Sequence, residues 1–90
     1  SEIVDAVGDK IDVICEGGFQ RGTHMLKALS LGAKACAGGR LYLYALAAAG
    51  QAGVERALGQ YRNELERGMK LMGCKKISEL NRNNLRFRKL

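Results

Sequence analysis

Two pairs of glycines, at residues 17–18 and 38–39, stand where anion-binding chemistry could occur. Each pair ends a short run of small or β-branched residues and is followed by a basic side chain, Arg21 or Arg40. Glycine lets backbone N–H groups approach an anion without a Cβ in the way. An arginine guanidinium can bind two phosphate oxygens at once. Each pair could also make only a tight turn, but because the device occurs twice we favour a phosphate site.

The elements that would position these groups follow from the spacing of apolar residues and glycines. In chain order we expect the end of a helix over residues 1–8, a strand over 11–15, a helix over 24–31 with Thr23 as N-cap, a strand over 33–37, helices over 41–49 and 51–72 separated by Gly50, and a helical turn over 77–80. Strands that alternate with helices indicate parallel pairing. Since ligands bind at the C-terminal ends of parallel strands, both glycine pairs should meet at one edge.

The longer helix over residues 51–72 has an amphipathic pattern. Its predicted packing side includes Leu58 and Tyr61, and its predicted solvent side includes Glu64 and Glu66. We therefore expect an ordinary covering helix.

Two short parallel strands cannot form a self-sufficient sheet, because parallel sheets are covered on both faces and usually have more strands. We expect the chain either to self-associate through its strands or to be a piece of a larger α/β barrel or sheet, and we favour the second. The chain starts at Ser1 without an initiator methionine, as expected for a processed or trimmed chain.

Composition and charge exclude several classes of protein. The 90 residues are 47% apolar and 27% charged, which is typical of one small globular domain. Residues 1–81 carry 11 basic and 9 acidic side chains, whereas residues 82–90 carry four basic and none acidic. This distribution argues against a nucleic-acid-binding face spread over the domain. The basic tail comprises Arg82, Arg86, Arg88 and Lys89.

That tail has two interpretations. The one we favour is a solvated or subunit-bridging arm; the other is peripheral contact with an acidic surface such as anionic lipid. No apolar stretch reaches the roughly 18 residues that a membrane span needs. The three cysteines, without CxxC spacing, are expected to be unpaired thiols of a cytoplasmic protein, and no metal site is predicted. They are Cys15, Cys36 and Cys74.

The glycine pairs lie within longer motifs. These read EGGFQRGT over residues 16–23, LKALSLGA over 26–33 and GGRLYLYALA over 38–47. Together with GVER over 53–56 and LMGC over 71–74, they resemble the C-terminal quarter of the FMN-dependent α-hydroxy-acid dehydrogenases and oxidases, which include lactate and mandelate dehydrogenases and glycolate oxidase. The resemblance covers nearly the whole chain.

The resemblance implies an α/β fold in which residues 1–81 are the C-terminal quarter of a (β/α)8 TIM barrel, strands seven and eight with their helices, and not a complete barrel. FMN would lie at the barrel mouth. The implied partners are the remaining barrel strands, a homo-oligomer, and a small 2-hydroxy acid in the complete enzyme only.

The resemblance also assigns roles to individual residues. Gly18 and Gly39 would donate backbone N–H groups to the FMN phosphate, and the guanidinium of Arg40 would hold that phosphate. Two positions depart from the family motif Asp-Gly-Gly-x-Arg-Arg-Gly: Glu16 replaces the Asp that faces the ribityl chain, and Gln20 replaces the first Arg. The implied FMN-binding set is Glu16, Gly17, Gly18, Gln20, Arg21, Gly39 and Arg40, with Arg21 partly compensating for Gln20.

No catalytic residue is expected in this chain, because the family's catalytic His, Arg, Tyr and Lys precede the part that it matches. His24 is expected to be a surface or packing residue, and Tyr42 and Tyr44 to pack. We expect a C-terminal FMN-phosphate-binding segment of an enzyme that oxidises a small L-2-hydroxy acid to a 2-oxo acid, inactive as an isolated chain. The alternative is a non-catalytic truncated remnant that self-associates, with at most a vestigial phosphate site.

Overall fold

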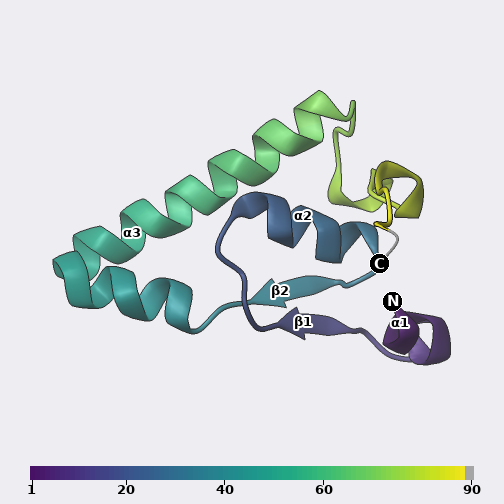
Figure 1. Ribbon diagram of the computed structural model, residues 1–90, viewed down its shortest axis with the longest axis horizontal. Helices are drawn as coiled ribbons and strands as arrows, with labels where there is room; N and C mark the ends of the chain where they lie inside the picture. The colour runs from purple at the N-terminus through teal and green to yellow at the C-terminus, as the bar shows by residue number, and fades with distance from the viewer. Residues whose placement is uncertain (89–90) are drawn as a thin grey trace.

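The computed structural model of the chain describes residues 1–88 (Figure 1). Helices and two short strands alternate from the N-terminus, and two single turns of 3-10 helix follow the last helix. The elements are α1 (Glu2–Val7), β1 (Ile14–Glu16), α2 (Gly22–Ser30), β2 (Ala35–Ala37), α3 (Arg40–Leu71) and the 3-10 turns Ile77–Glu79 and Arg82–Asn84.

The two strands pair in parallel, as predicted, with Cys15 opposite Cys36 and Glu16 opposite Ala37. Both strands start later than predicted. Gly32 ends α2 with a φ of +110°, and the N–H of Ala33 still donates to Ala28 O, so the chain leaves the helix only after this point. The N–H of Lys34 donates to Val13 O at 2.8 Å just before the paired residues.

One face of the sheet is covered by α2, which lies between the strands and α3 (Figure 1). The buried core consists of Leu26 and Leu29 from α2, Met69 from α3 and Leu80 from the segment that follows. In contrast, Ile11 and Ile14 are 60% and 63% exposed on and beside β1. The open side of this sheet fits the expectation that the strands need further partners.

A sharp bend divides α3 into two arms. Ala49 (φ −149°, ψ 20°) and Gly50 (φ 60°, ψ −146°) leave helical geometry, and the chain turns back on itself there (Figure 1). Glycine adopts this positive φ without the steric cost that other residues meet. The predicted break at Gly50 is therefore confirmed.

Three side chains lie differently from expectation. Thr23 is not the N-cap of α2: the helix begins at Gly22 after an extended Arg21, and no side chain of the cap residue bonds to the helix. Leu58, predicted to pack, is 53% exposed, whereas Glu64, predicted to face solvent, is buried. The burial of Glu64 explains why Thr23 is not the N-cap: the carboxylate of Glu64 accepts the N–H of Gly22 at 2.9 Å and so takes the place of a capping side chain.

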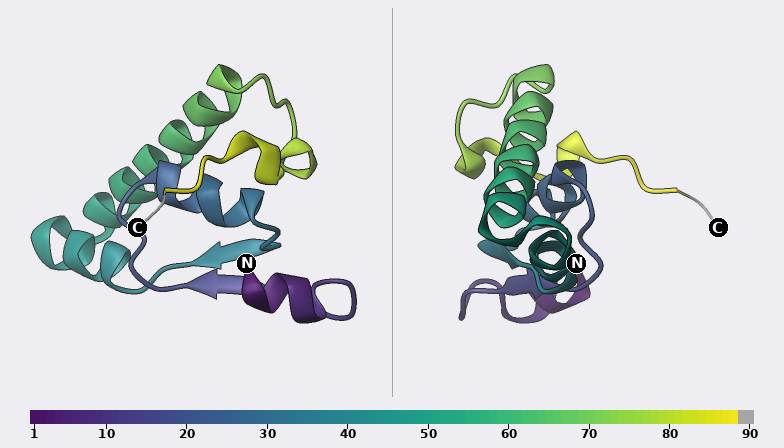
Figure 2. Two further views of the ribbon diagram at one scale, coloured as in Figure 1. Left: turned by 45° about the vertical axis from the view of Figure 1, so that its right-hand side comes forward. Right: turned by 90° about the vertical axis from the view of Figure 1, so that its left-hand side faces the viewer.

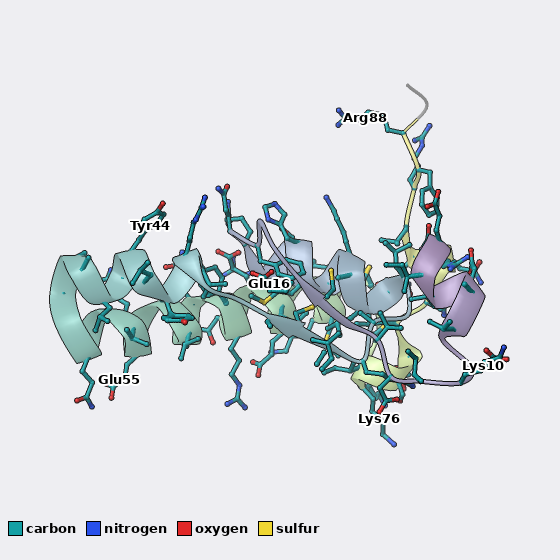
Figure 3. The ribbon with its side chains drawn as sticks, turned by 90° about the horizontal axis from the view of Figure 1, so that it is seen from below. Lys10, Glu16, Tyr44, Glu55, Lys76 and Arg88 are labelled. Carbon is teal, nitrogen blue, oxygen red and sulfur yellow. The ribbon has the colours of Figure 1, made fainter. Side chains whose placement is uncertain are left out.

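Arg82 links the C-terminal segment, residues 82–88, to the N-terminal helix. The guanidinium of Arg82 donates to the carboxylate of Asp5 on α1, so this residue does not belong to a free arm. Arg86 and Arg88 are exposed, and the chain there extends away from the body (Figures 2 and 3). Lys89 of the predicted tail lies outside the described residues. Within residues 1–88 no helix has the length and apolar character that crossing a membrane requires.

Candidate functional site

A cavity of about 600 Å³ lies at the C-terminal ends of both strands. Its walls come from the loop after β1, the loop after β2, the start of α3 and one residue of the second arm of α3. The lining residues are Glu16, Gly17, Gly18, Phe19, Gln20, Gly38, Gly39, Arg40, Leu41, Tyr44 and Tyr61. The structure thus brings six of the seven predicted site residues around one cavity and leaves out Arg21.

The loop after β1 requires glycine for its backbone conformation. Gly17 and Gly18 have φ angles of +112° and +71°. A Cβ built on either residue would meet no heavy atom within 4 Å, so crowding is not the reason. Two successive left-handed residues turn the chain sharply at the end of the strand.

The loop after β2 leads directly into a helix N-terminus. Gly39 is the N-cap of α3, and its carbonyl accepts the N–H groups of Tyr42 and Leu43 at 3.2 and 3.1 Å. A Cβ at Gly39 would likewise meet nothing within 4 Å. The first N–H groups of the helix have no intrahelical acceptor and carry the positive end of its dipole. This edge of the cavity therefore offers N–H donors to an anion.

The charged groups at the cavity are Arg40 and Glu16. Arg40 is exposed, and no ion pair among residues 1–88 involves it; the pairs found are Arg21–Glu64, Arg62–Glu66 and Arg82–Asp5. Glu16 lies at the end of β1, while the side chain of Tyr44 projects from the first arm of α3 (Figure 3). Tyr44 is 66% exposed and lines the cavity, so the expectation that it packs is wrong for the described chain. The donor set, backbone N–H groups plus one unpaired guanidinium, fits a phosphate group.

His24 does not line the cavity, in agreement with its predicted role as a surface or packing residue. It is half-buried, and its Nδ1 accepts the N–H of Gln20 at 3.2 Å. This hydrogen bond links the loop after β1 to the first turn of α2.

Arg21 points to a different partner. Its Nε lies 3.0 Å from both carboxylate oxygens of Glu64, 43 residues away in the sequence. It lines a separate recess together with residues of α3, among them Arg56 and Arg67. The expectation that Arg21 makes up for Gln20 at the phosphate is therefore not supported by its position, because its guanidinium is held by a carboxylate outside the cavity.

Glu64 is the residue that the sequence-based reasoning missed. The Arg21 hydrogen bond, and then that of the Gly22 N–H, hold the pKa of its carboxyl below the ordinary value. A signal was present, since Glu64 stands three residues after Tyr61 and next to Leu65. Residues three apart lie on the same face of a helix, so Glu64 shares the face of the partly buried Tyr61.

The sequence model of the FMN-dependent dehydrogenase family matches residues 1–87. The chain belongs to this family. A peroxisomal (S)-2-hydroxyacid oxidase of Arabidopsis thaliana is 45% identical over 85 residues, which is 94% of this chain and 23% of that protein. Human 2-hydroxyacid oxidase 2 is 43% identical over 90 residues, which is 100% of this chain and 26% of that protein.

A solved structure shows the same relation. A soluble mutant of the membrane-associated (S)-mandelate dehydrogenase from Pseudomonas putida superimposes with a TM-score of 0.90 at 36% identity, covering 97% of this chain and 24% of that one. The chain thus spans about a quarter of the length of these relatives. The structural neighbours are FMN-dependent TIM-barrel enzymes, and this chain is a partial α/β unit in which residues 1–88 form no closed barrel. FMN, the predicted cofactor, is the cofactor of the family.

Proposed function

We propose that this chain is the C-terminal, FMN-phosphate-binding segment of a flavin-dependent oxidoreductase, contributing strands seven and eight of its barrel over residues 1–81. The enzyme would oxidise a small L-2-hydroxy acid to a 2-oxo acid. The observation that carries the proposal is the cavity at the ends of two parallel strands, where both glycine pairs and Arg40 come together.

In this proposal the chain's own groups bind and orient the phosphate end of the cofactor. Gly18 and Gly39 donate backbone N–H groups, and Arg40 donates from its guanidinium. Near the first glycine pair, Glu16 would accept a hydrogen bond from a polar group of the cofactor, and the side-chain amide of Gln20 would donate one. FMN supplies the chemistry when bound, since it takes up the two electrons of the hydroxy acid.

The groups that act on the substrate would come from outside this chain. The remaining barrel strands would cover the exposed apolar side chains of Ile11 and Ile14 on the open sheet face.

Because the groups that act on the substrate would lie outside this chain, we expect the chain by itself to have no turnover of lactate, glycolate or mandelate with added FMN. Measurable turnover would contradict the proposal. A cytoplasmic location, a homo-oligomer and peripheral membrane contact through the tail remain predictions.

The decisive test is Arg40→Ala in the protein as encoded by its own gene. Loss of a charged hydrogen bond should weaken FMN and inorganic phosphate binding roughly tenfold to a hundredfold. Calorimetric or flavin-fluorescence titration measures this loss. Arg62→Ala is the matched control, because Arg62 is exposed and its ion pair within residues 1–88 is with the nearby Glu66. Equal affinities of wild type and Arg40→Ala would mean that the glycine pairs are turns only.

A second function, a non-catalytic remnant that self-associates, is favoured by one observation. The first arm of α3 exposes Tyr42, Leu43 and Leu46 by 45%, 51% and 48%, on a chain whose sheet is also open. A homo-oligomer in sedimentation, together with a gene that begins near Ser1, would support the remnant. An in-frame upstream segment with a His-Gly-Gly-Arg-type motif would support the enzyme.

A further inference from the structure

The ion pair between Arg21 and Glu64 lies at the C-terminal end of the loop of residues 16–20, which forms one wall of the cavity. Gln20, the residue before Arg21, lines the cavity, and so does Tyr61, which precedes Glu64 by three residues on α3. The carboxylate side chain of Glu64 is only 10% exposed and bonds to Arg21 through both oxygens. One group on α3 thus holds the end of the loop while a neighbour on the same helix shapes the cavity.

The same carboxylate also fixes the start of α2. The N–H of Gly22 donates to Glu64 Oε2 at 2.9 Å. A Cβ on Gly22 would come within 2.5 Å of Tyr61 O and 2.7 Å of Leu65 N, so the backbone of α2 lies directly against that of α3. Such close packing leaves the loop little freedom at this end, because both the charge and the backbone of residues 21–22 are engaged.

We propose that Arg21 and Glu64 are positioning residues that hold the loop of residues 16–20 in the geometry that binds phosphate, and that Arg21 is not itself a phosphate ligand. This inference rests on the proposed FMN-phosphate site. It concerns how the first glycine pair is presented to the anion, since only two residues, Phe19 and Gln20, separate that pair from Arg21.

The sign of one effect separates positioning from direct binding. Glu64→Gln removes a negative charge beside an anion site and releases the guanidinium of Arg21. If Arg21 bound the phosphate, or if electrostatics alone mattered, this substitution would tighten phosphate binding. If the pair positions the loop, the same substitution weakens binding.

The experiment titrates inorganic phosphate and FMN against wild type, Glu64→Gln, Arg21→Ala and the double variant, in the protein as encoded by its own gene. We expect each single variant to bind roughly fivefold to thirtyfold more weakly. The double variant should lose no more than either single one, because both remove the same contact. Glu66→Gln is the matched control, since its carboxylate pairs with the exposed Arg62 on the same helix.

Hydrogen exchange without any ligand gives a second measurement. Glu64→Gln should speed exchange of the amides of residues 17–22 and leave those of β2 unchanged, whereas Glu66→Gln should change neither. If Glu64→Gln does not fold, Arg21→Lys decides: it keeps the charge but not the Nε contact with both oxygens, so positioning predicts weaker binding and unchanged binding would contradict it.

Failure of the positioning role and failure of the proposed FMN-phosphate site give different results. Weaker binding by Arg40→Ala together with unchanged or tighter binding by Glu64→Gln would overturn the positioning role alone. No binding of FMN or phosphate by the wild type, or no effect of Arg40→Ala, would overturn both. Additive losses in the double variant would show that Arg21 and Glu64 act independently, which also contradicts the inference.

Discussion

The loop after β1 and the loop after β2 border the same cavity but are held in different ways. The first is bonded by side chains at its far end, through His24 to Gln20 and through Glu64 to Arg21 and Gly22. Among residues 1–88, no side-chain hydrogen bond involves residues 38–40 of the second loop, which only begins the exposed arm of α3. Contacts within this chain therefore hold the first half of the site, whereas the second half begins a helix arm whose apolar side chains are exposed.

The largest expected effect comes from adding a methyl group at Gly22, where the end of the first loop packs against α3. Gly22→Ala places a Cβ 2.5 Å from Tyr61 O and 2.6 Å from Glu64 Cβ, so backbone must move. We expect a loss of about 2–4 kcal/mol in the free energy of unfolding, measured by urea denaturation.

Gly39→Ala is the control in the second loop. Its φ is −119° and no heavy atom lies within 4 Å of the added Cβ, so the change should cost less than about 1 kcal/mol. Equal losses for the two variants would mean that α2 and α3 are not packed as closely as described.

The same contrast explains what the sequence could and could not predict. Local signals gave the order of the elements, the break at Gly50 and the loop glycines, since each depends on residues within a few positions. The burial of Glu64 and the true direction of Arg21 depend on a contact across 43 residues. A glutamate is almost never fully buried unless it is paired, so its residue type favoured the solvent side although it stands three residues after Tyr61. The late start of β2 likewise follows from how Ala33 completes the end of α2.

A smaller effect should come from restoring the family's arginine in the first loop. Gln20→Arg adds a positive charge at the cavity wall, and we expect it to tighten phosphate binding about threefold to tenfold because the site is open to solvent. Gln51→Arg adds the same charge on α3, at the exposed Gln51 that bonds to Glu55. A titration in which both variants tighten binding equally would reduce the effect to net charge and remove the special role of the first loop.

The smallest predicted effect concerns pH and compares Glu64 with Glu66 on the same helix. Arg21 and Gly22 hold the pKa of the Glu64 carboxyl below its ordinary value of 4.5, so folding favours the charged form. Its stabilising contribution is present above that ordinary value and is lost as the pH falls through the lowered pKa. The difference in unfolding free energy between wild type and Glu64→Gln should therefore be constant from pH 7 to about pH 6 and shrink toward zero in acid. For Glu66→Gln the difference should be small throughout, because an exposed i,i+4 pair contributes little in water. Denaturation of the three proteins at several pH values provides the measurement. A Glu64→Gln difference that stays the same in acid would mean that shape rather than charge holds the first loop, and the contrast between the two loops would then rest on packing at Gly22 alone.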